Sequence, residues 1–189
     1  MGLSHSWMAV KASSRTAALE ALGFLETGDE ADLSALFAGA ELATGWYVIR
    51  SRDVEFATPK RLSQVSAASG VVLAGQVEEH VMVSSLRRFD DGDETWWVIH
   101  EPEKGIFDLS FGGAPPKLLS EIRERLVAVQ QSEGGEEANV DFIFEVPVQL
   151  GVALCGYRVD GGDGSEEPEF TELQPPRRPS LLARLFARA

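Results

Sequence analysis

The sequence predicts an α+β domain in which an antiparallel sheet of about five strands carries helices packed mainly on one face. Two observations support this prediction. A valine-rich stretch at 71–86 and the segment Thr95–His100 flank the turn residues Asp90–Asp93, which is the pattern of a β-hairpin. Strict alternation at 107–111 then predicts a third strand, and an apolar stripe at helical spacing in 118–129 predicts a long helix after it.

The length of 189 residues, with 44% hydrophobic and 25% charged residues, is typical of one globular domain. We expect this single domain to span residues 1–158. Residues 159–179 are rich in Gly, Asp, Glu and Pro, so we expect a disordered acidic linker there. Residues 180–189 then form a basic amphipathic tail.

The N-terminal half begins with strand-like and helix-like segments in alternation. The apolar run Trp7–Val10 predicts a strand, and Ala17–Leu22 predicts a helix that Gly23 ends. Residues 26–45 predict no more than one irregular turn of helix. Residues 46–50 are aromatic and β-branched and predict a strand. A second helix starts at Thr58 as its N-cap, with proline in its first turn.

The C-terminal half continues beyond the hairpin with two further predictions. Val140–Val146 alternates apolar and acidic residues and predicts a short strand. Pro147–Cys155 predicts a buried helix capped by Gly156, with Gly151 as its weak point because glycine costs about 1 kcal/mol inside a helix. Cys155 itself reads as a small buried hydrophobic residue.

The charge is distributed unevenly along the chain. The whole chain carries −13, but residues 177–189 hold four arginines and no acid, so residues 1–176 carry −17. Such an acidic body excludes duplex nucleic acid as the expected partner, because phosphate binding requires cations. A basic protein is the expected electrostatic partner.

The number of cysteines and the hydropathy of the chain predict where in the cell the protein resides. The only cysteine, Cys155, has no partner for an internal disulfide, and the first twenty residues lack the apolar region of a signal peptide. No stretch approaches the ~20 apolar residues of a membrane span. We therefore expect a cytoplasmic protein, peripheral to the inner membrane if its tail docks there.

The tail has the pattern of a short docking helix. On a helical wheel its four large apolar residues fall within a sector of about 140°, with arginines on the flank. About ten residues are too few for a stable isolated helix, so we expect folding only on contact with an anionic membrane, a groove on a partner or the acidic body. The predicted docking residues are Arg177, Arg178, Leu181, Leu182, Arg184, Leu185, Phe186 and Arg188.

One cluster of candidate catalytic or metal-binding residues is Glu78, His80 and His100. If the hairpin turns on Asp91-Gly92, His100 faces Val83 and His80 lies on the other sheet face, which excludes a joint site. A three-residue loop with a bulge instead places His100 opposite Met82 and beside His80. No metal, phosphate-binding or nucleophile motif accompanies the cluster, so we expect no cofactor and no metal.

The segments Trp7–Val10, Leu19–Gly23 and Val77–Met82 resemble those of a family of small bacterial proteins without an assigned function. The resemblance covers residues 1–160, stops before the tail and implies nothing about mechanism.

Three function classes remain open. The first is a non-catalytic acidic protein that binds a basic partner, in the manner of an immunity protein, an inhibitor or an adaptor. The second is a peripheral membrane adaptor that docks through the tail. The third is a hydrolase that uses His80 and His100.

Overall fold

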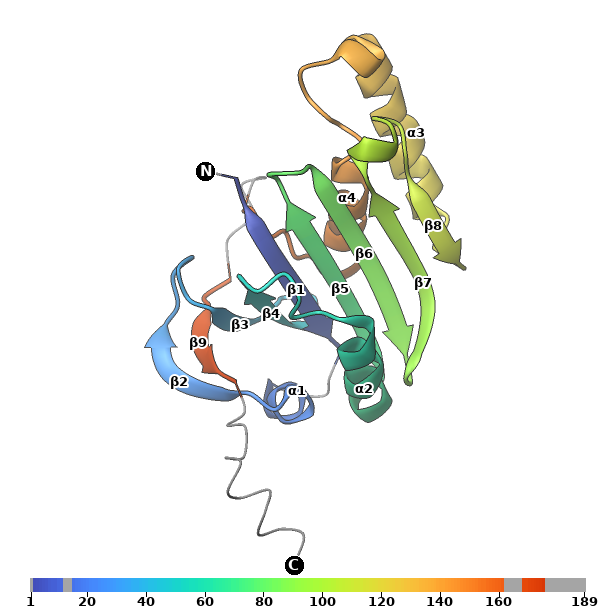
Figure 1. Ribbon diagram of the computed structural model, residues 1–189. Coiled ribbons are helices and arrows are strands. Elements are labelled where there is room, and N and C mark those ends of the chain that lie inside the picture. Colours follow the sequence, from blue (N-terminus) through green and yellow to red (C-terminus); the bar gives the residue numbers. More distant parts are fainter. Residues whose placement is uncertain (1, 12–14, 162–167, 176–189) are drawn as a thin grey trace, which may run out of the picture.

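The computed structural model describes residues 2–11, 15–161 and 168–175, which build one antiparallel sheet with helices on both faces (Figure 1). The sheet contains nine strands in the order β2-β9-β3-β4-β1-β5-β6-β7-β8. The α+β class and the antiparallel sheet are confirmed, but the predicted number of about five strands is wrong. The strands are β1 (Ser4–Val10), β2 (Leu25–Glu30), β3 (Phe37–Glu41), β4 (Tyr47–Ser51), β5 (Val71–Glu78), β6 (Val83–Asp90), β7 (Asp93–His100), β8 (Ser110–Gly113) and β9 (Thr171–Gln174).

Four α-helices cover the sheet within the described residues. They are α1 (Arg15–Leu22), α2 (Pro59–Ser69), α3 (Leu118–Ser132) and α4 (Glu145–Cys155). Two short 3-10 turns, η1 (Pro102–Lys104) and η2 (Gly135–Glu137), precede β8 and follow α3. The predicted start of α2 is confirmed, since the Thr58 hydroxyl accepts a hydrogen bond from the Arg61 amide and Pro59 follows it.

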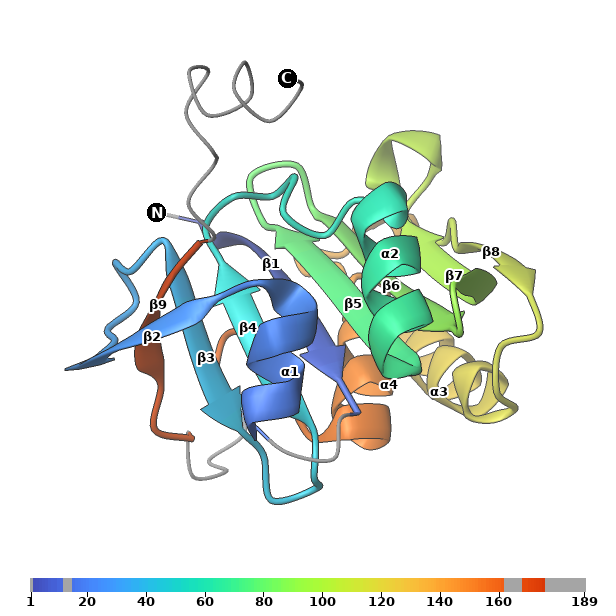
Figure 2. The same cartoon turned by 90° about the horizontal axis from the view of Figure 1, so that it is seen from below.

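The two faces of the sheet carry separate hydrophobic cores, which strand β1 supplies by alternation. Trp7 and Ala9 point into the core under α3 and α4, whereas Met8 and Val10 point into the core under α1 and α2. Figure 2 shows α1 and α2 together on the near face. The prediction that helices pack mainly on one face is therefore wrong, because central strands with apolar residues on both sides need cover on both sides.

The region 26–45, predicted to be irregular, forms β2 and β3 instead. Strand β2 has a single β-branched residue, Thr27, and β3 has none; the middle of β3 is built of small residues. A side chain at Gly39 has no room, because its Cβ would lie 2.3 Å from the Tyr47 hydroxyl. Small residues in β3 thus leave room for the large side chains of β4. The strand propensity of residues 37–41 alone does not reveal this requirement.

The predicted disordered linker is also wrong where the structure describes it. Phe170 and Leu173 are buried, and β9 lies between β2 and β3 in the sheet. The segment pairs antiparallel with β2 on one side and with β3 on the other, and its two buried apolar residues pack into the cores of the two sheet faces. The fold therefore extends past residue 158, and the predicted tail at 180–189 lies outside the described residues.

Two further predictions shift. The predicted strand Val140–Val146 is a turn that leads into α4, because Asp141 Oδ1 accepts the amides of Ile143 and Phe144 and so starts the helix. The third strand of the hairpin region begins at Ser110 instead of Phe107. Within α4, Gly151 has a packing reason, since a Cβ there would lie 3.1 Å from the ring of Trp7.

Candidate functional site

The structure separates the predicted cluster of Glu78, His80 and His100. The hairpin turns on Asp91-Gly92, both with positive φ, but a bulge between Arg88 and Phe89 shifts the later pairs by one residue. His100 therefore faces Ser84, an arrangement that neither predicted register contains.

The three residues of the cluster have different surroundings. Ser84 pairs with Val77, so Val77, Ser84 and His100 share one sheet face and Glu78 lies on the opposite one. Glu78 accepts a hydrogen bond from the hydroxyl of Ser4. His80 is exposed in the turn after β5. The residues do not form a joint site.

His100 itself is fully buried and fully bonded. Its Nδ1 lies 2.6 Å from the carbonyl oxygen of Asp108, and its Nε2 lies 2.8 Å from Asp141 Oδ2. Burial lowers the pKa of His100, but the hydrogen bonds and the charge of Asp141 outweigh that effect and raise it above its usual value. Because both partners are acceptors, the cationic imidazole, in which both ring nitrogens donate, is the form that satisfies both contacts.

A cationic imidazole with both N–H groups bonded has no free nitrogen to accept a proton, so it is unsuited to general-base catalysis. His100 instead joins the end of β7 to the loop at Asp108 and to the start of α4. The described residues also hold no group of three His, Cys, Asp or Glu side chains that could bind a metal ion.

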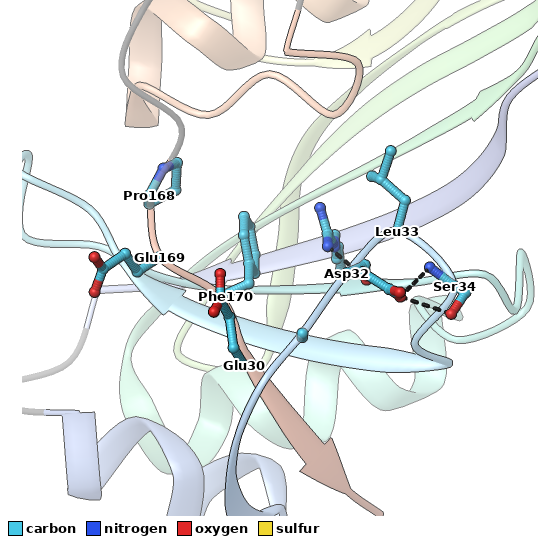
Figure 3. A pocket seen from close by; sticks show the side chains of 9 residues that line it. Glu30, Asp32, Leu33, Ser34, Pro168, Glu169 and Phe170 are labelled. Carbon is cyan, nitrogen blue, oxygen red and sulfur yellow. Dashed lines mark hydrogen bonds between the residues drawn. The ribbon is translucent and has the colours of Figure 1, made fainter.

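A better candidate lies at the β2–β9 end of the sheet, where the structure has a cavity of about 610 Å³ (Figure 3). Three separate segments build it: the connection from β2 to β3, strand β4, and the residues just before β9. The Ala31 amide donates to the carbonyl of Phe170 at 2.8 Å and joins two of these segments. The lining residues are Glu30, Ala31, Asp32, Leu33, Ser34, Arg50, Pro168, Glu169 and Phe170.

The buried cation of this cavity is Arg50, whose exposed fraction is only 5%. Its guanidinium stacks on the ring of Phe170 at 4.2 Å from the ring centre. Its Nη2 donates to the carbonyl oxygen of Asp32 at 2.9 Å. The two contacts fix the orientation of the guanidinium.

Three carboxylates form the rim of the cavity, at Glu30, Asp32 and Glu169, and all three residues are exposed. Asp32 Oδ1 accepts the Ser34 amide at 2.7 Å and the Ser34 hydroxyl at 2.6 Å, which lowers the pKa of Asp32. Figure 3 shows this carboxylate turned toward Ser34 and the Glu169 side chain directed away from both. The rim therefore presents negative charge to solvent.

Exposed leucines accompany the negative charge. Leu33 in the rim and Leu36, just before β3, are 59% and 56% exposed. Exposed apolar side chains that lie together within a polar rim are a feature of interaction sites. The arrangement suits a ligand that has both cationic and apolar groups.

Sequence reasoning missed this site because residues 30–34, 50 and 168–170 come together only through the sheet. One signal was present. Arg50 closes the otherwise apolar run Trp46–Ile49, and a charged residue in a strand buried on both faces requires a special environment.

Other predicted residues have structural roles or lie outside the described part. Trp96 is buried in one face and Trp97 is half-buried on the other, stacked against Arg87. Cys155 is buried, as expected. The docking residues of the tail lie outside the described residues. No helix of the described residues is long and apolar enough to cross a membrane.

Comparisons of the chain with protein-family models, with curated protein sequences and with solved structures give no match.

Proposed function

We propose that this chain is a non-catalytic interaction protein that binds a basic protein partner at the β2–β9 end of its sheet. The observation that carries the proposal is the cavity rim, which combines the carboxylates of Glu30, Asp32 and Glu169 with exposed Leu33, while Leu36, also exposed, follows three residues later in the chain. The rim belongs to a body of residues 1–176 with net charge −17, which attracts cationic partners over long range.

The physical argument has two parts. Carboxylates at the rim contribute mainly to the association rate and to partner choice, and their effect is screened by salt. The leucines add burial of apolar area, at roughly 25 cal/mol per Å². A basic, amphipathic segment of a partner satisfies both requirements. The surroundings of His80 and His100 give no support to the hydrolase alternative.

The experiment compares two variants with the same change of net charge. The rim variant carries Glu30→Gln, Asp32→Asn and Glu169→Gln, and the asparagine keeps an acceptor for Ser34. The control variant carries Glu133→Gln, Glu136→Gln and Glu137→Gln, three exposed residues in the segment that follows α3. Each protein is used to capture partners from a lysate of its source organism, with and without residues 177–189.

We expect the rim variant to lose about tenfold or more in partner affinity, since three exposed ion pairs at up to 1 kcal/mol each are removed. The control variant should stay within about twofold of the unmodified protein. Equal loss in both variants would mean that net charge alone attracts partners. Loss only on removal of residues 177–189 would move the interaction to the tail.

A further inference from the structure

Among the residues that the structure describes, the cavity holds a buried positive charge, that of Arg50, without an ion-pair partner. Among the described residues, the ion pairs involve Arg15, Arg87, Arg88, His100, Lys104 and Arg158, and none involves Arg50. Arg50 is nevertheless one of the most buried charged side chains of the protein, at 5% exposure. Within the described part of the chain, its side chain donates to the carbonyl oxygen of Asp32 and stacks on the ring of Phe170.

The described carboxylates nearest in the fold form no ion pair with Arg50, although hydrogen bonds from Ser34 and, more weakly, the charge of Arg50 lower the pKa of Asp32. Asp32 holds Ser34 with its side chain and offers Arg50 only its main-chain oxygen. Glu30 and Glu169 line the same cavity, yet neither forms an ion pair with Arg50. The guanidinium has five N–H donors, and its hydrogen bond to the carbonyl oxygen of Asp32 uses one nitrogen.

A buried charge that lacks a counter-charge is costly, and a fixed guanidinium fork is well suited to a carboxylate. The stacking on Phe170 and the bond to Asp32 hold the fork before any ligand arrives. A ligand carboxylate would therefore pair with a preorganised donor and lose little side-chain entropy on this side of the interface.

The rim selects among anions. A phosphate carries more negative charge than a carboxylate and is repelled more by Glu30, Asp32 and Glu169. A carboxylate that arrives with cationic neighbours is attracted by the same rim. The cavity has a volume of about 610 Å³. A chain terminus can enter such a cavity, because only one length of chain has to fit, whereas an internal segment would have to enter and leave again.

We infer that Arg50 binds the C-terminal carboxylate of a basic partner segment, while the rim carboxylates bind the cationic side chains next to that terminus. This inference rests on the proposed function and adds the chemical group that the partner presents. It makes Arg50 the residue that determines specificity within the site.

The test uses two probes, the acetylated tetrapeptide Lys-Leu-Lys-Ala with a free C-terminal carboxylate and the same peptide with a C-terminal amide. Isothermal titration calorimetry at low salt measures both against the full chain. We expect the free acid to bind about tenfold more tightly than the amide, because only the carboxylate forms charge-assisted hydrogen bonds with the guanidinium. This comparison needs no substitution in the protein.

Two variants locate the effect. Arg50→Gln should remove the preference for the free acid, whereas Arg123→Gln, an exposed arginine on α3, makes the same charge change and should keep it. A circular dichroism melt shows whether the Arg50→Gln variant is folded. If the variant is unfolded, the comparison of the acid and amide peptides on the unmodified protein decides whether a carboxylate site exists.

The remaining outcomes overturn the inference. Equal binding of acid and amide by the unmodified protein refutes a carboxylate site at Arg50, and the proposed function stands if that binding is lost in the rim variant. Binding of neither peptide also refutes the inference, and partner capture by the rim and control variants then decides the proposed function separately.

Discussion

His100 Nε2 lies 2.8 Å from Asp141 Oδ2, and this contact joins the end of β7 to the turn that leads into α4. The same aspartate accepts the amides of Ile143 and Phe144 through its other oxygen. The pair therefore holds two parts of the chain together and starts a helix. Its role is structural, which leads to the first prediction.

His100→Gln should lower the free energy of unfolding by about 3 kcal/mol, because it leaves Asp141 in a site built for an ion pair. Urea unfolding followed by circular dichroism measures the change. His80→Gln is the matched control, since His80 is exposed and should shift stability by less than about 0.5 kcal/mol. An unchanged stability of His100→Gln would refute the structural role, and loss of partner binding at unchanged stability would restore a functional one.

The second prediction concerns the pH dependence of the same pair. The folded state raises the pKa of His100 above its unfolded value, so folding is favoured by protonation of this residue. The stabilisation is fully present below the unfolded pKa of about 6.5 and is lost as the pH rises through the folded pKa.

The difference in unfolding free energy between the unmodified protein and His100→Gln should therefore be larger at pH 5.5 than at pH 9. Urea titrations at both pH values, each with His80→Gln alongside, measure it. A difference that grows toward high pH would mean that His100 is neutral in the fold.

The helices, strands and turns that could be predicted from sequence are those that depend on residues close to one another in the chain. The Thr58-Pro59 start of α2, the Asp91-Gly92 turn and the stripe of α3 all depend on neighbours within a few residues. Strands β2, β3 and β9 carry no such signal, because their order comes from partners far along the chain.

The candidate site also combines a part that the sequence indicates locally with a part that depends on residues far along the chain. Arg50 could be located in a strand, but the stacking partner Phe170 lies 120 positions later, in a segment whose composition indicated a linker. The register of His100 failed for a related reason. A single bulge at Arg88 and Phe89 shifts the pairing by one residue, and alternation alone does not specify bulges.

The third prediction concerns His5, which is 8% exposed and has no hydrogen-bond partner for either ring nitrogen within the described residues. His5→Leu should raise the free energy of unfolding by about 1 kcal/mol, because it removes two unsatisfied polar atoms from a buried place. Gln76→Leu, on the neighbouring strand and half-buried, is a control for added apolar area. A fall in stability would mean that the imidazole has an essential partner.

The sign of the pH effect at His5 is opposite to that at His100. Burial and the charges of Arg50 and Arg52 lower the pKa of His5, so the unfolded state binds the proton more tightly. Stability is therefore lost as the pH falls from about 6.5 toward the folded pKa. The gain from His5→Leu should accordingly be larger at pH 5 than at pH 8 in the same urea titrations.

The fourth prediction is that Cys155 does not react in the native protein. Burial raises its pKa to about 11, and its Sγ donates to the carbonyl of Gly151 at 3.3 Å. The thiolate, which is the nucleophile, is therefore scarce at pH 7.5. A colorimetric disulfide reagent should modify the thiol in guanidinium chloride and leave the native protein unmodified over the same time. Rapid modification of the native protein would contradict the burial.

The last prediction tests the membrane alternative through residues 177–189. Each large apolar residue buried contributes about 1.5–3 kcal/mol, much of it offset by ordering the segment, and each arginine adds about 1 kcal/mol near an anionic surface. A peptide of these residues should gain helix on phosphatidylserine vesicles, measured by circular dichroism, and the gain should fall as salt rises. Leu185→Asp should abolish the gain, whereas Ala187→Asp makes the same charge change on the opposite side of the helical wheel and should reduce it less. If the peptide gains no helix on the vesicles while the full chain still captures a partner through its tail, the membrane alternative is refuted. Docking of the tail in a groove of a partner protein then remains.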